Sequence, residues 1–303
     1  MEAITGKSTK AERTAFKRPL AAAPRETAFG RPRDFLDNHF VYVVVSSRAH
    51  GLSLGINMNP DKFCNFDCIY CEVDRRRPSP ALKLDADAMA SELRRTLTFV
   101  QQGRLRELPD YHGLPDELLQ LRHVALSGDG EPTLAPEFAD AVEAVIRVRA
   151  LGGFPFFKIV LITNAAGLDQ PQVLQGLEHF TKSDEIWTKL DGGTQEFLDK
   201  VNRPKMPLEK TIANILALAR RRPVVIQSLF AAINGEEPSH DEIQQYAQRL
   251  SDLVRDGAQI SLVQIYSATR PMAHAECEHL PLKMLSFIAQ TVRNATGLKV
   301  EVF

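Results

Sequence analysis

The stretch KIVLITNAAGLDQPQVLQGLEHFTKSDEIWTKL, residues 158 to 190, contains the unit from which the fold is built. It begins and ends with short apolar runs, 158 to 164 and 185 to 190, that predict two strands. The segment between them, 170 to 179, has apolar residues three and four positions apart and predicts a helix. A strand, a helix and a second strand in this order predict a βαβ unit with parallel strands.

The same alternation extends over most of the chain. Further strands are predicted at 52–57, 123–128, 224–230 and 260–266, and further helices near 87–102, 136–150, 207–220, 241–255 and 282–296. Six βα units result, which favour an α/β fold in the form of a partial (βα)6 TIM-like barrel, although a doubly wound open sheet fits the same order. Residues 40–47 and 299–303 are extra strand candidates without a predicted place. In either architecture, the chemistry belongs at the carboxyl ends of the strands.

Composition agrees with a folded protein. The 303 residues are 44% hydrophobic and 25% charged, which excludes disordered, collagen-like and disulfide-scaffold classes. A net charge of −1 gives no overall attraction to nucleic acid. The longest apolar runs are shorter than the roughly 20 residues that a bilayer span requires, and the N-terminus has no secretory signal pattern. We therefore expect a cytoplasmic protein that is not embedded in a membrane.

The N-terminal part has a different composition. Residues 1 to 33 contain eight Lys and Arg against three Glu, together with many Pro and Ala. This pattern predicts a flexible, disordered basic extension over residues 1–38, followed by one barrel domain over residues 39–303 that ends in a helix and a strand. An organelle transit peptide and an arm that contacts nucleic acid have a similar composition.

Three of the four cysteines follow the first predicted strand of the barrel. Cys64, Cys68 and Cys71 form C-x3-C-x2-C, whereas Cys277 lies far away in the sequence. Three thiolates at this spacing can hold a 4Fe-4S cluster and leave one iron without a protein ligand. A structural zinc site needs four ligands, and no His or Cys follows at finger spacing. A disulfide framework needs an exported protein. The spacing therefore favours an iron–sulfur cluster.

This motif, with Tyr70 directly before its last cysteine, resembles that of the radical S-adenosylmethionine (SAM) superfamily. The resemblance implies that the cysteines hold a 4Fe-4S cluster whose free iron binds S-adenosyl-L-methionine. It also implies an oxidoreductase in which the reduced cluster cleaves this cofactor to a 5′-deoxyadenosyl radical that abstracts hydrogen from a substrate. An external flavodoxin- or ferredoxin-like protein would donate the electron.

The segment SGDGEPTL, residues 127 to 134, ends the second barrel strand. Its glycines allow the backbone to approach a ligand, although capping turns of this kind are common in α/β proteins. In the family a Gly-Gly-Glu-like motif at this place binds the amino group of the cofactor's methionine. The resemblance therefore assigns Gly130 and Glu131 to cofactor binding, with Asp129 in place of the first glycine.

Polar residues also end the next two strands. Asn164 and Asp191 could bond the ribose or the methionine carboxylate of the cofactor, and an equally good interpretation makes each a turn or capping residue. With Tyr70, they complete the predicted cofactor-binding residues.

Within the superfamily, the chain most resembles the group related to wyosine-forming tRNA enzymes, often described as Fe-S oxidoreductases. The likeness runs from about residue 40 to 271 and includes SSRAHG (46–51), SLGINMNPDKFCNFDCIYC (53–71), SGDGEPTL (127–134), VNRP (201–204) and VQIYSATRP (263–271). It implies a tRNA base as the substrate. Four polar side chains of these motifs would line the barrel mouth: Arg48, Asn202, Arg203 and Arg270. The arginines among them suit a phosphate or carboxylate of the substrate, and each could instead be a surface or ion-pair residue.

One departure keeps other functions open. Wyosine-forming enzymes are known for a second cluster bound by additional N-terminal cysteines, and residues 1 to 63 contain none. A peptide or a small metabolite is the alternative substrate, and a non-enzymatic metal-binding regulatory protein is the alternative from another class. Two weaker candidates are Lys189 as a Schiff-base lysine and a second metal site at Cys277 with its neighbouring histidines.

Overall fold

The computed structural model describes residues 35–76, 82–269, 272 and 274–303. The predicted extension therefore lies almost wholly outside the described residues, as does Arg270, and its flexibility stays a prediction. The strands are β1 (Val41–Ser46), β2 (Gly51–Asn57), β3 (Leu121–Ser127), β4 (Lys158–Thr163), β5 (Glu185–Lys189), β6 (Val224–Leu229), β7 (Ala231–Ile233), β8 (Ile260–Tyr266), β9 (Cys277–His279) and β10 (Val300–Val302). The α-helices are α1 (Ala86–Gln101), α2 (Pro109–His112), α3 (Phe138–Ala150), α4 (Pro171–Glu178), α5 (Gln195–Val201), α6 (Leu208–Ala219), α7 (His240–Arg255) and α8 (Leu282–Thr296).

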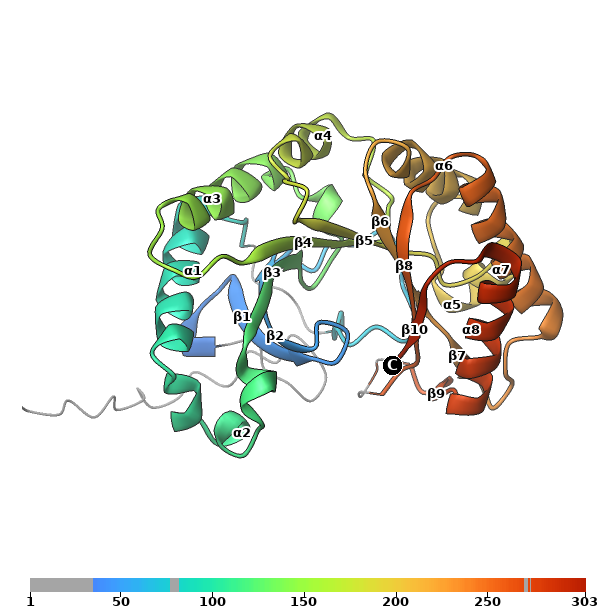
Figure 1. The fold of residues 1–303 in the computed structure, drawn as a ribbon, viewed down its shortest axis with the longest axis horizontal. Coiled ribbons are helices and arrows are strands. Elements are labelled where there is room, and N and C mark those ends of the chain that lie inside the picture. Colours follow the sequence, from blue (N-terminus) through green and yellow to red (C-terminus); the bar gives the residue numbers. More distant parts are fainter. Residues whose placement is uncertain (1–34, 77–81, 270–271, 273) are drawn as a thin grey trace, which may run out of the picture.

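Eight strands form one curled sheet in the order β1-β2-β3-β4-β5-β6-β8-β10. β1 is antiparallel to β2, and the other neighbouring pairs are parallel. The longer helices follow the outside of the curl, and the sheet ends at β1 on one side and at β10 on the other (Figure 1). The predicted partial barrel is confirmed, and the doubly wound alternative is wrong because helices cover only the outer face.

The six predicted strands and six predicted helices are present, with ends that differ by about two residues. The two strand candidates without a predicted place become the edges of the sheet, β1 and β10. Sequence periodicity missed α2 and α5 and the three-residue strands β7 and β9, which pair with each other and are too short to show a period. In the described parts of the chain, no helix is long and apolar enough to cross a membrane.

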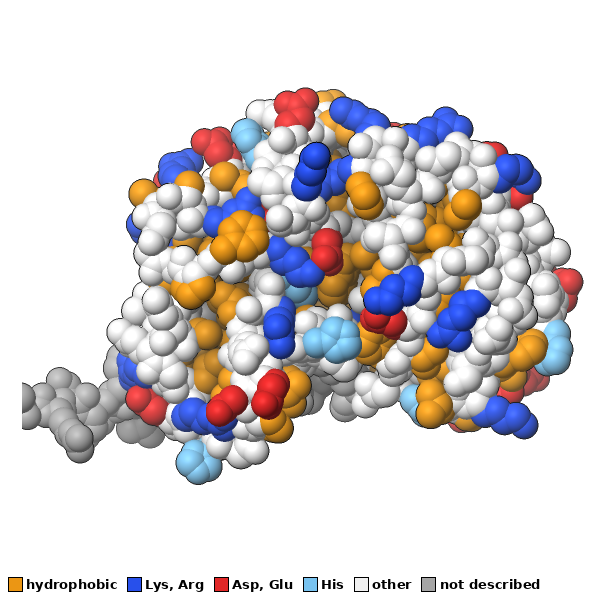
Figure 2. Space-filling model, in the orientation of Figure 1, with side chains coloured by type: hydrophobic (Ala, Val, Ile, Leu, Met, Phe, Trp, Pro, Cys, Tyr) orange, Lys and Arg blue, Asp and Glu red, His pale blue; other side chains and the backbone are white. Residues whose placement is uncertain are grey.

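Side chains alternate between the two faces of each strand. The outward set, such as Leu54, Leu161 and Ile226, packs with the helices in the main hydrophobic core. On the inward face, Trp187 and its neighbours on β4 and β6 form a separate buried cluster near the amino ends of the strands. Figure 2 shows this hollowed side of the molecule, with hydrophobic side chains inside the hollow and charged side chains around it. Towards the carboxyl ends, the inward side chains become polar, starting with Lys189 and Gln227.

Candidate active site

The cysteines lie on the loop that follows β2, and a second loop holds this loop in place. The amides of Asp67 and Ile69 donate hydrogen bonds to the carbonyls of Asn202 and Val201, at 3.0 and 2.9 Å. Both acceptors belong to the VNRP segment, where α5 ends. These backbone hydrogen bonds therefore fix the cysteine loop against the carboxyl end of α5.

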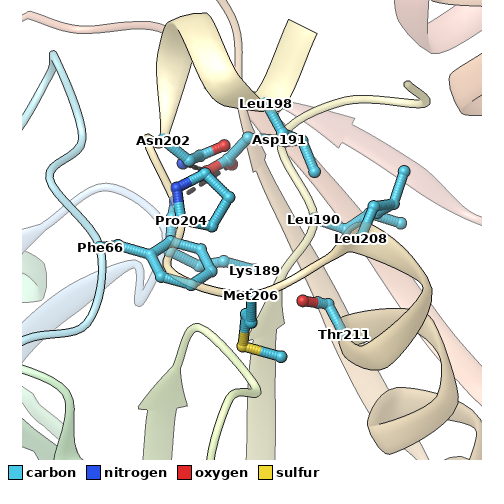
Figure 3. Close-up of a pocket in the computed structure, with 10 residues that line it drawn as sticks. All are labelled: Phe66, Lys189, Leu190, Asp191, Leu198, Asn202, Pro204, Met206, Leu208 and Thr211. Atoms are coloured by element: carbon cyan, nitrogen blue, oxygen red, sulfur yellow. Dashed lines mark hydrogen bonds and ion pairs between the residues drawn. The ribbon is translucent and has the colours of Figure 1, made fainter. Parts of the chain in front are cut away.

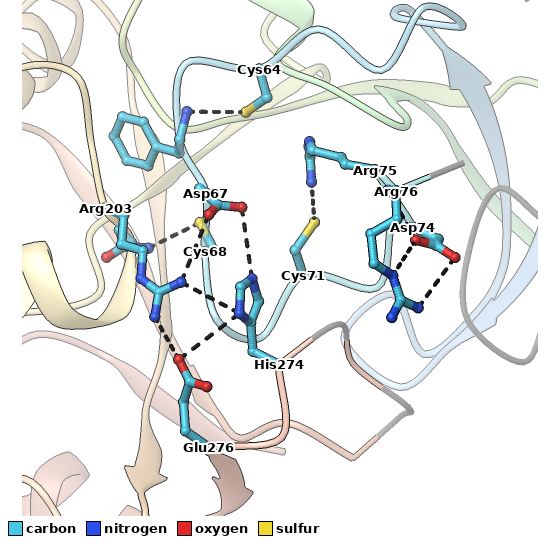
Figure 4. A network of polar contacts seen from close by, with 12 residues as sticks. Cys64, Asp67, Cys68, Cys71, Asp74, Arg75, Arg76, Arg203, His274 and Glu276 are labelled. Atoms are coloured by element: carbon cyan, nitrogen blue, oxygen red, sulfur yellow. Dashed lines mark hydrogen bonds and ion pairs between the residues drawn. The ribbon is translucent and has the colours of Figure 1, made fainter. Parts of the chain in front are cut away.

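Each cysteine sulfur accepts a hydrogen bond from a different part of the chain (Figure 4). Arg75 Nη1 lies 2.9 Å from Cys71 Sγ, and Asn202 Nδ2 lies 3.3 Å from Cys68 Sγ. Cys64 Sγ receives the Phe66 amide at 3.5 Å, and Asn164 Nδ2 lies 3.9 Å away. N–H groups that point at sulfur suit cysteines that carry negative charge.

The three cysteines are free thiols at intermediate exposure. Burial raises the pKa of Cys64 to about 11, with a smaller contribution from Glu131, and burial raises the pKa of Cys68 to about 12. Without a metal these two thiols keep their protons, and loading with metal must release them. No three His, Cys, Asp or Glu side chains in the described ranges are placed to hold a single metal ion. A cube needs no such site, because each of its irons takes one thiolate.

Asp191 lies at the centre of a buried polar network beside the cysteine loop. Its Oδ2 accepts hydrogen bonds from the Tyr70 hydroxyl and, at 2.8 Å, from Asn202 Nδ2, while Oδ1 accepts the Leu229 amide at 2.8 Å. Lys189 Nζ lies 3.2 Å from Asp191 Oδ1. The structure thus brings together two of the predicted cofactor-binding residues, Tyr70 and Asp191, with the side chain that bonds to Cys68.

Asn202 contributes a further feature that points to a ligand. Its Oδ1 atom is buried and has no hydrogen-bond partner among the residues that the structure describes. The side chain lines a small pocket of about 10 Å³ together with Asp191, Phe66 and Met206 (Figure 3). Because buried carbonyl oxygens in proteins almost always accept a hydrogen bond, a hydroxyl or ammonium group is expected beside it.

Lys189 is placed as a permanent cation. Its Nζ donates to the Tyr266 hydroxyl at 3.0 Å and lies 4.9 Å from the centre of the Tyr70 ring. Burial alone would lower the pKa of Lys189, but the Asp191 carboxylate, together with Tyr266 and Cys68, more than reverses this effect, and the pKa lies above its usual value. A lysine that keeps its proton is a poor nucleophile, so this environment does not favour the Schiff-base interpretation.

The SGDGEP turn packs directly on the cysteine loop. A Cβ atom added at Gly130 would lie 1.9 Å from the Phe63 carbonyl oxygen, and the Glu131 amide donates to that same oxygen at 3.0 Å. Asp129 is tied to Asn57 of β2 by two hydrogen bonds of 2.9 Å each. Gly130 is therefore required for the close contact between this turn and the cysteine loop.

The Glu131 carboxylate is fully engaged with its own chain. It accepts hydrogen bonds from the Thr133 amide and hydroxyl, the Thr163 hydroxyl and the Asn164 amide, at 2.5 to 3.1 Å. Burial raises its pKa, and these hydrogen bonds oppose the shift. The side chain thus joins the carboxyl ends of β3 and β4, and a direct contact with a cofactor stays a prediction.

A second cavity opens between the β1–β2 turn and the end of β8. It measures about 130 Å³ and is lined by Arg48, Tyr70, Glu72, Tyr266 and residues of neighbouring loops. The Arg48 guanidinium lies 4.1 Å from the centre of the Tyr266 ring. Arg48 is thus at the barrel mouth, where the sequence placed it, and it offers a cation and a stacking surface to a ligand.

Arg203 has the ion-pair role that the sequence left open as an alternative. It pairs with two carboxylates, Glu276 and Asp67, the latter at 3.7 Å, and His274 lies beside them (Figure 4). It therefore ties the cysteine loop to the segment before β9. Cys277 is buried in β9, and the described part of this region holds no set of metal ligands.

Three kinds of comparison relate the chain to known proteins. The family model described as "Radical SAM superfamily" matches residues 58–250. A UPF0026 protein of Helicobacter pylori is 27% identical over 185 residues, which cover 59% of this chain and 52% of that protein. A UPF0026 protein of Synechocystis is 29% identical over 171 residues, which cover 56% and 54%. The chain thus spans about half the length of these relatives.

Solved structures share the fold at low sequence identity. A radical SAM methyltransferase from Sphaerobacter thermophilus superposes with a TM-score of 0.60 at 16% identity, covering 88% of this chain and 70% of that one. SuiB of Streptococcus suis bound to S-adenosylmethionine gives 0.56 at 14%, covering 84% and 51%. TYW1 with a lysine-pyruvate adduct bound gives 0.53 at 15%, covering 91% and 82%.

Proposed function

Because this chain belongs to the radical SAM superfamily, we propose that it is an enzyme whose three loop cysteines hold a 4Fe-4S cluster that activates S-adenosyl-L-methionine. The observation that supports this best is the arrangement around the cysteines. Three thiols lie on one loop at the carboxyl ends of the strands, and each sulfur accepts an N–H group from the chain. The three sulfur ligands fit an iron–sulfur cluster, and the Asn202 Oδ1 atom, which has no hydrogen-bond partner among the described residues, fits a polar organic ligand beside it.

The roles of the residues follow from their positions. Cys64, Cys68 and Cys71 would each bind one iron. When bound, such a cluster supplies one electron that cleaves a carbon–sulfur bond of the cofactor, and the resulting 5′-deoxyadenosyl radical abstracts hydrogen from the substrate. An external flavodoxin- or ferredoxin-like protein would supply that electron. The curled sheet and its outer helices would exclude water from this reaction.

We assign the cofactor to the polar groups that surround the cysteine loop. Asp191 would orient Tyr70 and Asn202 towards the cofactor. Asn164 lies within reach of the cysteine loop through Asn65, at 2.9 Å. Gly130 lets the backbone of its turn approach the loop, and Glu131 fixes the end of β4. Tyr70 would close the site from the side of the larger cavity.

Electron paramagnetic resonance tests the proposal. The full chain is reconstituted with iron and sulfide without oxygen, reduced with dithionite and measured with and without S-adenosylmethionine. We expect a reduced 4Fe-4S signal whose g-values change when the cofactor is added, because the cofactor reaches the open iron. A chain that takes up no cluster, or a cluster that does not respond to the cofactor, contradicts the proposal and favours a metal-binding regulatory protein.

For the substrate we propose a tRNA base. The motifs shared with wyosine-forming enzymes and the cavity at Arg48 and Tyr266 support it, since an arginine beside an aromatic ring suits a phosphate next to a stacked base. Binding of a purified tRNA pool at moderate salt should saturate and weaken as salt rises. A flat signal contradicts this substrate and favours a peptide or a small metabolite.

A further inference from the structure

Arg75 connects the two segments that meet at the candidate cluster. Its Nη1 donates a hydrogen bond to Cys71 Sγ at 2.9 Å (Figure 4). Its Nη2 donates to the backbone carbonyl of Asp129 at 3.1 Å. The first acceptor belongs to the cysteine loop and the second to the turn after β3. Both ends of the guanidinium are therefore engaged, and its position relative to the sulfur is fixed.

The carbonyl that orients Arg75 is itself rigidly held. The amide and the carboxylate of Asp129 are both bonded to the Asn57 side chain, at 2.9 Å each. The next residue, Gly130, packs its backbone on the carbonyl of Phe63 with no room for a side chain. Arg75 therefore cannot swing away from Cys71 without breaking its hydrogen bond to this rigid turn.

The other two cysteine sulfurs have different donors. Cys68 receives the neutral amide of Asn202 at 3.3 Å, and Cys64 receives the neutral Phe66 amide at 3.5 Å. Of the residues that the structure describes, Arg75 is the one cation that donates a hydrogen bond to a cysteine sulfur. Its contact is also the shortest of the three, and arginine stays charged at every working pH.

We propose that Arg75 is a positioning residue that raises the reduction potential of the cluster held by Cys64, Cys68 and Cys71. The inference rests on the proposed function. Reduction adds one negative charge to the cluster, and a fixed positive charge with an N–H group on a ligand sulfur stabilises the reduced form more than the oxidised form. Arg75 thus makes the electron transfer from the external donor more favourable.

The chain offers a matched control one residue away. Arg76 is also an arginine, but its side chain is 76% exposed and pairs with Asp74 at 3.0 Å. Arg75→Gln removes the charge but keeps a side chain that can donate a hydrogen bond. Arg75→Lys keeps the charge and loses the two-pronged geometry. Arg76→Gln removes a charge of the same kind from the same loop without touching a cysteine.

The test is a redox titration of the reconstituted full chain, followed by electron paramagnetic resonance, with iron and sulfide measured for each variant. For Arg75→Gln we expect wild-type iron content and a midpoint at a more negative potential. At a fixed potential the ratio of reduced to oxidised cluster should fall by about tenfold, or about 59 mV for a one-electron couple. Arg75→Lys should lie between this variant and the wild type, and Arg76→Gln should match the wild type.

The outcomes separate this inference from the proposed function. A wild-type chain that takes up no cluster contradicts the proposed function and removes the basis for a role of Arg75. A loaded wild type with an unchanged midpoint in Arg75→Gln overturns the inference alone. If Arg75→Gln takes up no cluster, Arg75→Lys is the deciding variant. The inference is overturned if the cluster of Arg75→Lys has the same midpoint potential as the clusters of the wild type and of Arg76→Gln. A more negative midpoint potential in Arg75→Lys supports the inference.

Discussion

The inward face of the sheet differs sharply between its two ends. Near the amino ends of the strands, Val160, Trp187 and Val225 form a buried apolar cluster. The His123 ring packs edge to face on the Trp187 ring, with 5.3 Å between the ring centres. Lys189 follows Trp187 by two residues at the end of β5, and Asp191 follows it by four residues in the turn after β5. Both belong to a network of charged and hydrogen-bonded groups. Within five residues, the chain thus changes from an apolar side chain that packs in the barrel to charged side chains of the candidate active site.

The difference shows how the fold divides its tasks. Burying apolar side chains stabilises the barrel by about 25 cal/mol per Å² of apolar surface removed from water. Burying an ion pair such as Lys189 and Asp191 gives little net stability, because removing the two charges from water is costly. We therefore expect changes at the amino end to affect unfolding, and changes at the carboxyl end to affect binding and turnover.

The largest effect is expected from the cysteines. Cys64→Ala, Cys68→Ala and Cys71→Ala should each abolish cluster uptake and cofactor cleavage, because a cube with two protein ligands is not held. Iron content and the formation of 5′-deoxyadenosine under dithionite measure both properties. Cys277→Ala is the matched control, since this buried thiol lies in β9, outside the C-x3-C-x2-C motif. Cleavage that survives in any of the first three variants would refute the cluster assignment.

At the opposite end, Trp187→Ala should destabilise the fold and leave cluster uptake intact. Trp187 is buried, and its truncation leaves a cavity that costs roughly 3–5 kcal/mol. Urea unfolding of the cluster-free chain, followed by circular dichroism, gives the change in unfolding free energy. Phe156→Ala is the control, because Phe156 is 67% exposed and should change stability by about 0.5 kcal/mol or less. Equal effects of both variants would contradict the packing role of Trp187.

A smaller effect is expected at the carboxyl end from Asp191→Asn. This variant keeps the shape but removes the charge that holds Tyr70, Asn202 and Lys189 in place around the cofactor site. A hydrogen bond to a charged group contributes roughly 1.5–3 kcal/mol, so the affinity for S-adenosylmethionine should fall about tenfold or more. Calorimetric titration of the reconstituted chain measures it. Asp199→Asn changes an exposed carboxylate on α5 and serves as control. An unchanged affinity in Asp191→Asn would leave Asp191 with a structural role only.

The features of the two ends that depend on a periodic or a local sequence pattern could be predicted from the sequence. Strands and helices carry repeating apolar patterns, and the cysteine motif is a fixed spacing within eight residues, so both could be predicted. The polar strand ends at Asn164 and Asp191 were found because carboxyl ends of parallel strands meet at one edge.

The contacts between distant segments could not be predicted. Asn202 was selected for its motif, yet its bond to Cys68 joins residues 134 positions apart, and no local pattern encodes that distance. Glu131 was assigned to the cofactor, but the direction in which its side chain leaves the turn depends on how β3 and β4 are joined. Arg75 and Arg76 are neighbours of the same residue type in the sequence, and only the loop geometry distinguishes them.

His123 provides a test at the apolar, packed end of the sheet. Burial and, to a smaller extent, the nearby Lys158 lower its pKa to about 3, so the folded chain keeps this ring neutral. In the unfolded chain the ring titrates near 6.5, and between these two values the unfolded state binds more protons. The unfolding free energy should therefore fall as pH drops from about 6.5 towards 3, by at most about 1.4 kcal/mol per pH unit. His123→Phe keeps a ring against Trp187 and should remove the contribution of His123 to the pH dependence of the unfolding free energy. Urea unfolding from pH 7 to 4.5 measures this dependence. Identical slopes in the two proteins would show that His123 already takes up a proton in the folded barrel.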